Sequence, residues 1–160
     1  MITYHKAKER FGQTIENRDE FIKNISFTIK KYLNDNDYDF IIYPESSSDF
    51  IEKIVNLTGI PSIKVYKNDI DVILNITNSM KLQKMERCSH IERIKNMGKT
   101  FKINALKATQ RNKYEPYLFK PVSIPDGKGI IIDDSLFSGT TFRALEKVSG
   151  IKNWFAIFSK

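Results

Sequence analysis

Several residue types and patterns are scarce in this chain of 160 residues. A single cysteine excludes a disulfide framework and a zinc site built from several cysteines, and it suits a reducing compartment. Only 7 glycines and 5 prolines, beside 41% hydrophobic residues, exclude collagen-like and disordered chains. No run approaches the roughly 20 apolar residues of a membrane span, and residues 1–15 lack the apolar core of a signal peptide. We therefore expect a single soluble, cytoplasmic domain over residues 1–160 that makes no membrane contact.

Positive charge exceeds negative charge, since 26 Lys and Arg against 19 Asp and Glu give a formal net charge of +7. This excess favours anionic partners such as phosphates, nucleotides or nucleic acid. The basic residues are mostly lysines scattered along the chain, a distribution that is also typical of a solvated surface. Charge by itself leaves the partner open.

The spacing of apolar residues predicts alternating helices and strands. The predicted helices cover residues 15–33, 50–57 and 138–149. The predicted strands cover residues 39–43, 62–66, 129–133 and 154–158. Strands that alternate with helices in this way predict an α/β, Rossmann-like domain with a parallel sheet between helices.

An ambiguous segment, residues 68–117, interrupts this alternation, and we interpret it as an insertion. Residues 70–76 are compatible with a strand or with the start of a helix. An amphipathic helix is predicted over residues 79–97 and a strand over residues 100–103. The remainder of the segment is polar and basic.

The most distinctive pattern is IIIDDSLFSGTT, residues 130–141. A buried strand brings two carboxylates, Asp133 and Asp134, to its C-terminal end, where open α/β sheets bind ligands. The small and hydroxyl-bearing residues that follow open a helix, whose N-terminal N–H groups can bind a phosphate. Adjacent carboxylates accept hydrogen bonds from a sugar diol or hold the waters of a magnesium ion. The pattern predicts a ribose phosphate site, and the alternative is an ordinary turn with a helix cap.

This pattern resembles the ribose-5-phosphate-binding motif of type I phosphoribosyltransferases, which use 5-phosphoribosyl 1-pyrophosphate (PRPP). It is most similar to the version in the bifunctional pyrimidine-operon regulators with uracil phosphoribosyltransferase activity, where an aromatic residue precedes Thr-Gly and Arg-Ala-Leu follows. The resemblance implies a phosphoribosyltransferase-type fold in which Asp133 and Asp134 bind the ribose hydroxyls and, through water, magnesium. It implies that the 5′-phosphate is bound by Phe137, Ser138, Gly139, Thr140 and Thr141.

Two further segments fit the same family. The first lies between a predicted strand and helix, where the family places its pyrophosphate loop, and the alternative is a plain capping turn. This first segment comprises Glu45, Ser46, Ser47 and Ser48. The second is Lys67, which follows the strand where those regulators carry Tyr-Arg-Asp-Asp. By this resemblance Lys67 neutralises pyrophosphate and is catalytic together with Asp133 and Asp134.

The implied function is a magnesium-dependent phosphoribosyltransferase, which transfers ribose 5-phosphate from PRPP to a nitrogenous base and releases pyrophosphate. The alternative is a non-catalytic sensor of PRPP or nucleotides, or an RNA-binding regulator, which the net charge and the basic residues 95–113 favour. We expect a homodimer. Phe137 occupies the position of a catalytic Asp in 6-oxopurine phosphoribosyltransferases, which argues against that subclass and leaves the acceptor base open.

We expect the insertion to act as a mobile lid, because type I phosphoribosyltransferases place a flexible catalytic loop here. The hood that contacts the base is expected from residues 1–38, from residues 68–120 or from another subunit. The alternative is a rigid elaboration that packs on the core through Ile91, Ile94 and Met97. The cations expected to close over pyrophosphate are Lys99, Lys102, Lys107, Arg111 and Lys113.

Overall fold

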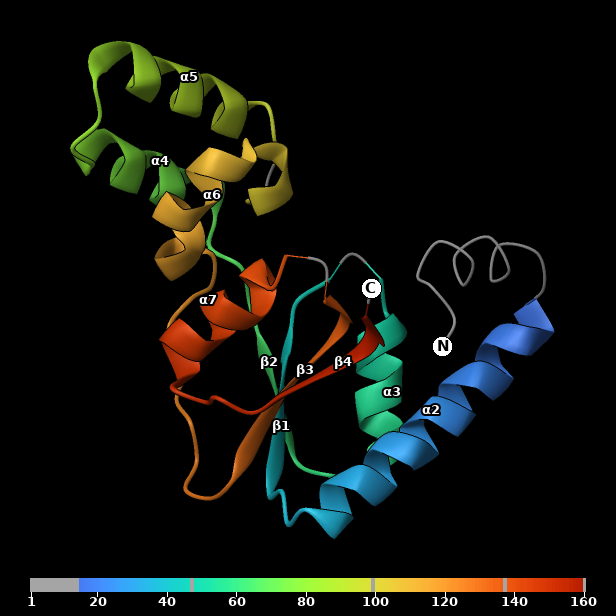
Figure 1. Cartoon of the computed structure of the whole chain (residues 1–160). Helices are drawn as coiled ribbons and strands as arrows, with labels where there is room; N and C mark the ends of the chain where they lie inside the picture. Colours follow the sequence, from blue (N-terminus) through green and yellow to red (C-terminus); the bar gives the residue numbers. More distant parts are fainter. Residues whose placement is uncertain (1–14, 47, 99, 137, 160) are drawn as a thin grey trace.

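A four-stranded parallel sheet forms the centre of the molecule (Figure 1). The computed structural model describes residues 15–46, 48–98, 100–136 and 138–159. The strand order is β2-β1-β3-β4. The strands are β1 (Phe40–Pro44), β2 (Ser62–Val65), β3 (Gly129–Leu136) and β4 (Trp154–Ser159). The predicted α/β class with a parallel sheet is thereby confirmed.

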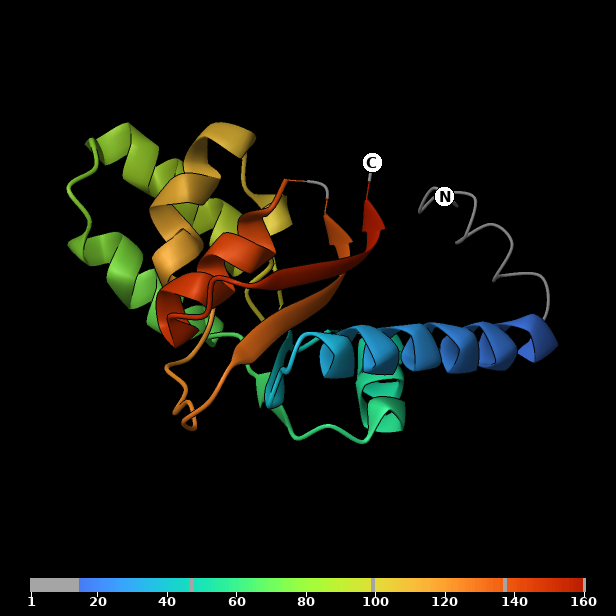
Figure 2. The same ribbon diagram turned by 60° about the horizontal axis from the view of Figure 1, so that its bottom comes forward.

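Two hydrophobic clusters cover the two faces of this sheet. On one face, α2 (Ile15–Asp35) and α3 (Phe50–Thr58) pack against Ile130 and Ile132 of β3. On the other face, α7 (Thr140–Ser149) packs against Ile131. Successive residues of β3 thus enter opposite clusters, as strand geometry requires. Figure 2 shows that α2 extends well past the sheet.

A compact group of helices, residues 70–117, connects β2 to β3, and we call it the helical segment (Figure 1). Its buried Ile73, Ile94 and Tyr114 belong to the same hydrophobic cluster as Ile131. The segment therefore shares its core with the α7 face of the sheet. Its elements are α4 (Ile70–Ser79), α5 (Lys84–Lys95), η1 (Ile103–Ala105), α6 (Ala108–Tyr114) and η2 (Glu115–Tyr117).

The two ends of the helical segment lie side by side, and we call residues 66–69 and 117–120 the neck. Lys67 and Phe119 form an isolated antiparallel bridge. The side-chain amide of Asn68 donates hydrogen bonds to two carbonyl oxygens of the opposite strand of the neck, at 2.9 and 3.0 Å. These contacts bring the chain back to the end of β2 before it continues to β3.

Two local predictions are wrong, and one ambiguous segment is resolved. Residues 100–103 are not a strand, because Phe101 is fully buried in the hydrophobic cluster and Ile103 begins a 3₁₀ helix. The ambiguous residues 70–76 are helical. β3 does not end at residue 133 but continues to Leu136, because it goes on pairing with β4.

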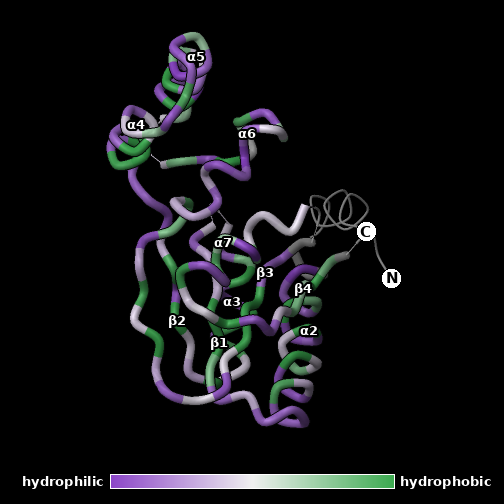
Figure 3. Tube along the Cα trace, turned by 60° about the vertical axis from the view of Figure 1, so that its left-hand side comes forward, coloured by the Kyte–Doolittle hydropathy of each residue, from purple (hydrophilic) through white to green (hydrophobic). Residues whose placement is uncertain are grey.

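The hydropathy of the chain follows this architecture, with hydrophobic residues gathered in the central strands (Figure 3). The strand residues Ile41, Ile42, Ile130, Ile131 and Ile132 are completely buried. Within the described ranges, no helix is both long enough and apolar enough to cross a membrane.

Candidate functional site

Three neighbouring strands bring the predicted site residues to one edge of the sheet. The chain leaves β1 into Glu45 and leaves β2 at the neck, close to Lys67, while Asp133 lies in the last half of β3. Strand β1 lies between β2 and β3, so the connections run to opposite sides of it. Open α/β sheets bind ligands at such a switch point, outside the carboxyl ends of the strands.

Asp133 is the buried carboxyl of this edge, with 8% of its surface exposed. Burial, followed by the negative charge of Asp134, raises the pKa of Asp133 from 3.8 to about 7. A hydrogen bond from the backbone N–H of Asp134 (2.8 Å), the positive charge of Lys67 and a hydrogen bond with the Thr141 side chain lower this pKa in part. The structure thus brings Asp133, Lys67 and Thr141 together from β3, the neck and α7.

Asp134 is half-buried and lies one residue further along β3. Because β3 continues to Leu136, both aspartates lie inside the strand, where successive side chains point to opposite faces. Asp133 contacts Thr141 on the α7 face, so Asp134 lies on the opposite side of the strand. The two carboxyls therefore do not form the side-by-side pair that a loop could present.

The loop after β3 changes direction at Gly139, whose φ of 67° is left-handed. This conformation favours glycine, since other residues bring their Cβ too close to the backbone. Helix α7 begins directly afterwards, so its first N–H groups point out of the helix end. The hydroxyls of Ser138 and Thr140 are hydrogen-bonded to each other at 2.9 Å. Phe137 lies outside the described residues.

Glu45 and Lys67, both predicted to meet pyrophosphate, contact each other through the backbone. The Glu45 carboxylate accepts the N–H of Lys67 at 3.1 Å, and the Glu45 N–H donates to the carbonyl of Val65 at 2.8 Å. Glu45 therefore holds the ends of β1 and β2 together. A carboxylate repels an anion, so we assign Glu45 to positioning the Lys67 end of β2.

The serines after β1 make turn contacts just before α3. The Ser46 hydroxyl accepts the N–H of Ser48 at 3.3 Å, and the Ser48 hydroxyl accepts the N–H of Phe50 at 3.2 Å. These are serine turns, and the N-cap residue of α3, Asp49, makes no side-chain cap hydrogen bond. Ser47 lies outside the described residues.

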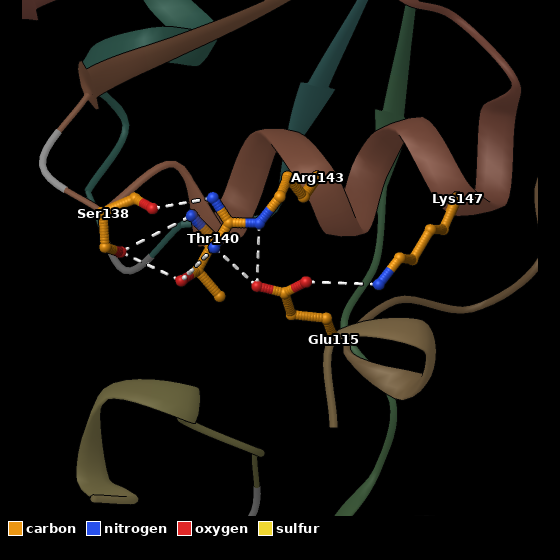
Figure 4. A network of polar contacts seen from close by, with 5 residues as sticks. All are labelled: Glu115, Ser138, Thr140, Arg143 and Lys147. Carbon is orange, nitrogen blue, oxygen red and sulfur yellow. Dashed lines mark hydrogen bonds and ion pairs between the residues drawn. The ribbon is translucent and has the colours of Figure 1, made fainter. Parts of the chain in front are cut away.

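A buried carboxylate of the helical segment reaches helix α7 (Figure 4). Glu115, 3% exposed, accepts hydrogen bonds from Arg143 at 2.6 and 3.0 Å and from Lys147 at 3.2 Å. Burial raises the pKa of Glu115, but the hydrogen bonds from Arg143 and Lys147 outweigh burial and leave this pKa below its ordinary value. We call these three residues the Glu115 bridge.

The same guanidinium also contacts the loop directly. Arg143 donates to the carbonyl oxygen of Ser138 at 2.9 Å and to the hydroxyl of Thr140 at 3.4 Å (Figure 4). Sequence reasoning noticed Arg143 as part of the Arg-Ala-Leu pattern but missed Glu115. Glu115 lies 28 positions before Arg143 in a polar stretch with no periodic signal.

The helical segment has the packing that its rigid interpretation predicts, with Ile94 fully buried and Met97 packed on the cluster, although Ile91 is half-buried. Of the expected cations, Lys113 forms an ion pair with Glu86 at 2.5 Å. Arg111 donates to a backbone carbonyl of the same segment at 3.2 Å. Lys102 and Lys107 are exposed, and Lys99 lies outside the described residues. Closure of this segment over a ligand remains a prediction.

Among the residues that the structure describes, no group of three or more His, Cys, Asp or Glu could hold a metal ion. Magnesium in phosphate-transferring sites commonly takes one or two carboxylates together with oxygens of the substrate and water. Asp133, on the α7 face, fits this mode as one such carboxylate, whereas Asp134 lies on the opposite side of the strand.

Comparison with protein-family models, with curated proteins and with solved structures gave no match to this chain. The likeness to phosphoribosyltransferases is therefore carried by the residues of the motif. The geometry of the sheet edge does not depend on this likeness and provides separate evidence on the site.

Proposed function

We propose that the chain binds PRPP at the C-terminal edge of the sheet and transfers its ribose 5-phosphate to a nitrogenous base with release of pyrophosphate. The observation that supports this best is the meeting of Asp133, Lys67 and Thr141 beside the left-handed Gly139. A buried carboxyl suits a sugar hydroxyl, an ammonium group suits pyrophosphate, and a helix N-terminus suits a 5′-phosphate. PRPP contains all three of these groups: a sugar hydroxyl, pyrophosphate and a 5′-phosphate.

In this proposal each residue acts on a different part of PRPP. The ionised Asp133 accepts a hydrogen bond from a ribose hydroxyl, and the N–H groups of residues 139–141 hold the 5′-phosphate. Lys67 neutralises the leaving pyrophosphate, which lowers the barrier because negative charge develops there. Magnesium, held through water by Asp133 together with oxygens of PRPP, would supply further neutralisation of that charge.

The helical segment stands on the same face of the sheet as Asp133 and Thr141, above the switch point. We propose that it covers the bound PRPP and contributes contacts to the acceptor base. Exclusion of water suits a reaction in which the ribosyl carbon becomes electrophilic. Limited proteolysis tests this role, because cleavage within residues 100–113 should be slower with magnesium and PRPP than without them.

A non-catalytic sensor of PRPP or nucleotides is the second candidate. One observation favours it: the backbone N–H groups of Glu45, Ser48 and Phe50 already donate within the protein, to the Val65 carbonyl and to the hydroxyls of Ser46 and Ser48. The segment predicted to bind pyrophosphate then offers fewer free donors, which weakens the case for turnover more than the case for binding. An RNA-binding regulator would rest on the net charge of +7.

Pyrophosphate release from PRPP, measured with magnesium and a panel of free bases, tests the proposed function. Release that depends on one base supports the transferase. Calorimetric binding of PRPP without release for any base supports the sensor. Absence of PRPP binding contradicts both, and tight RNA binding that weakens steeply with salt would then favour the RNA-binding regulator.

A further inference from the structure

The Glu115 bridge adds a polar link between the helical segment and α7, which also share one hydrophobic cluster, and through Arg143 it reaches the loop before α7. We propose that Arg143 is a positioning residue for this loop, and that through Glu115 the helical segment sets the affinity of the loop for a phosphate group. The inference rests on the proposed function, in which residues 138–141 hold the 5′-phosphate of PRPP.

The first argument is that the guanidinium of Arg143 is already used by the protein. Its Nε and Nη2 donate to Glu115, its Nη1 donates to the carbonyl of Ser138, and Nη2 also lies 3.4 Å from the Thr140 hydroxyl. All three nitrogens have protein acceptors, so we assign Arg143 to holding the loop and not to binding phosphate. Its contacts to Ser138 and Thr140 fix the loop on both sides of Gly139.

The second argument concerns the other end of the bridge. Glu115 directly follows Tyr114, whose hydroxyl is hydrogen-bonded to Thr77 of α4 at 3.0 Å and to His90 of α5 at 2.8 Å. Two consecutive residues are therefore fixed in different places, one in the core of the helical segment and the other on Arg143. A shift of the helical segment would carry Glu115 with it.

The third argument is that separating Glu115 from Arg143 and Lys147 would cost much free energy. Glu115 is almost completely buried, and a buried carboxylate without its cationic partners is strongly unfavourable. A planar guanidinium binds a carboxylate and a second acceptor in fixed directions, which an ammonium group cannot do. The position of Glu115 is thus imposed on Arg143, and through Arg143 on the loop.

Lys147 provides the matched control. It lies one turn along α7 from Arg143 and contacts Glu115, but the described contacts of its ammonium group do not include the loop. Lys147→Gln removes a positive charge and a contact to Glu115 from the same helix and leaves the contacts of Arg143 to the loop in place. Arg143→Lys keeps the charge but removes the fork that reaches Glu115, Ser138 and Thr140 together.

The experiment measures the affinity for ribose 5-phosphate by calorimetry and the hydrogen exchange of the backbone amides of residues 138–141. We expect Arg143→Lys to weaken binding by roughly tenfold, the loss of a charge-assisted hydrogen bond. We expect Glu115→Gln to weaken binding several-fold and Lys147→Gln less than twofold. Amide exchange in the loop should rise in the first two variants and not in the third.

The outcomes separate this inference from the proposed function. If wild-type protein does not bind ribose 5-phosphate, the phosphate site fails, and amide exchange alone decides whether Arg143 positions the loop. Equal losses in Arg143→Lys, which keeps its charge, and in Lys147→Gln, which leaves the contacts to Ser138 and Thr140 intact, would mean that these loop contacts are not responsible, and would overturn the inference. Unchanged loop exchange in Arg143→Lys would also overturn it. If Arg143→Lys does not fold, Glu115→Gln decides by the same two measurements.

Discussion

The two faces of the sheet differ in the polar groups that they bury. The face under α2 and α3 is mostly aliphatic, and the buried hydroxyls of Ser26 and Thr58 donate to carbonyl oxygens of their own helices. The face under α7 and the helical segment is different, because it buries polar side chains that contact other elements. Those side chains are Thr77, His90, Glu115 and Asp133.

The apolar face under α2 and α3 therefore mainly stabilises the fold, whereas the proposed site lies on the α7 face. Burial of apolar chains stabilises the fold directly, whereas burial of polar groups costs free energy unless each finds a partner. Among the described residues, the Nε2 atom of the buried His90 has no hydrogen-bond partner, and burial lowers the pKa of His90. Because such groups gather at functional sites, the α7 face is where we place the proposed site.

Truncation on the aliphatic face should give the largest loss of stability. Ile54 is fully buried between α3 and the sheet, so Ile54→Ala should lower the free energy of unfolding by about 3–5 kcal/mol through lost burial and a cavity. The matched variant Ile54→Val should cost about 1 kcal/mol. Urea denaturation measures both. PRPP affinity of the folded protein should stay at the wild-type value, and a selective loss of affinity would break the comparison between faces.

A substitution at Asp133, on the polar face, should raise the free energy of unfolding instead of lowering it. The pKa of Asp133 is raised in the folded state from 3.8 to about 7, so folding binds a proton between these values and stability falls as the pH rises through that window. Above pH 7 the buried Asp133 is ionised, and the full loss of stability applies. Asp133→Asn should therefore stabilise the ligand-free protein at pH 8 by roughly 2–4 kcal/mol, and hardly at pH 4.

The same Asp133→Asn variant should lose PRPP binding, because the carboxylate is replaced by an amide. Thermal unfolding at pH 4 and pH 8 measures the stability effect, and calorimetry measures the affinity. Asp126→Asn, at an exposed turn position, is the control for a general charge effect. A stabilised variant with wild-type affinity would remove Asp133 from the site.

The loop at Gly139 should show a moderate stability effect and a large effect on binding. Gly139→Val forces a β-branched residue into a left-handed conformation, which costs roughly 1–2 kcal/mol, and it should abolish ribose 5-phosphate binding. Asn tolerates this conformation, so Gly139→Asn should cost less stability. Chemical-shift mapping with ribose 5-phosphate checks the placement, which fails if the amides of residues 138–141 do not respond.

The smallest effect is expected within the helical segment. Tyr114→Phe removes the hydroxyl that joins Thr77 and His90 and should lower the free energy of unfolding by roughly 1–2 kcal/mol. Tyr117→Phe, at an exposed side chain, is the control and should be neutral. Denaturant unfolding measures both variants. Equal effects would mean that the buried hydroxyl adds no stability.

The core of the fold could be predicted from sequence because its elements have simple patterns. Helix α2 carries Ile22, Ile29 and Leu33 on one side, and β3 begins with a continuous apolar run. Residues 70–76 were ambiguous because Ile, Val and Leu at every second position satisfy a strand equally well. Packing decides for a helix, with Ile73 and Thr77 turned inward.

The site could be predicted only in part. Parallel-sheet geometry was enough to place Lys67 and Asp133 at one edge, since the ends of parallel strands meet there. The extension of β3 past Asp133 depends on pairing with β4 and has no local signal. The contact between Glu115 and Arg143 depends on how the helical segment packs, which no short motif encodes.

The neck has a consequence for exchange of parts between proteins. Because residues 66–69 and 117–120 are adjacent, the chain enters and leaves the helical segment at one place. A different segment of another length could be grafted between these ends without rerouting any strand, since loop closure depends weakly on length. A graft must supply a carboxylate in place of Glu115 and apolar cover for Phe142. Under the proposed function, such a graft would change the preference for the acceptor base and retain the phosphate loop.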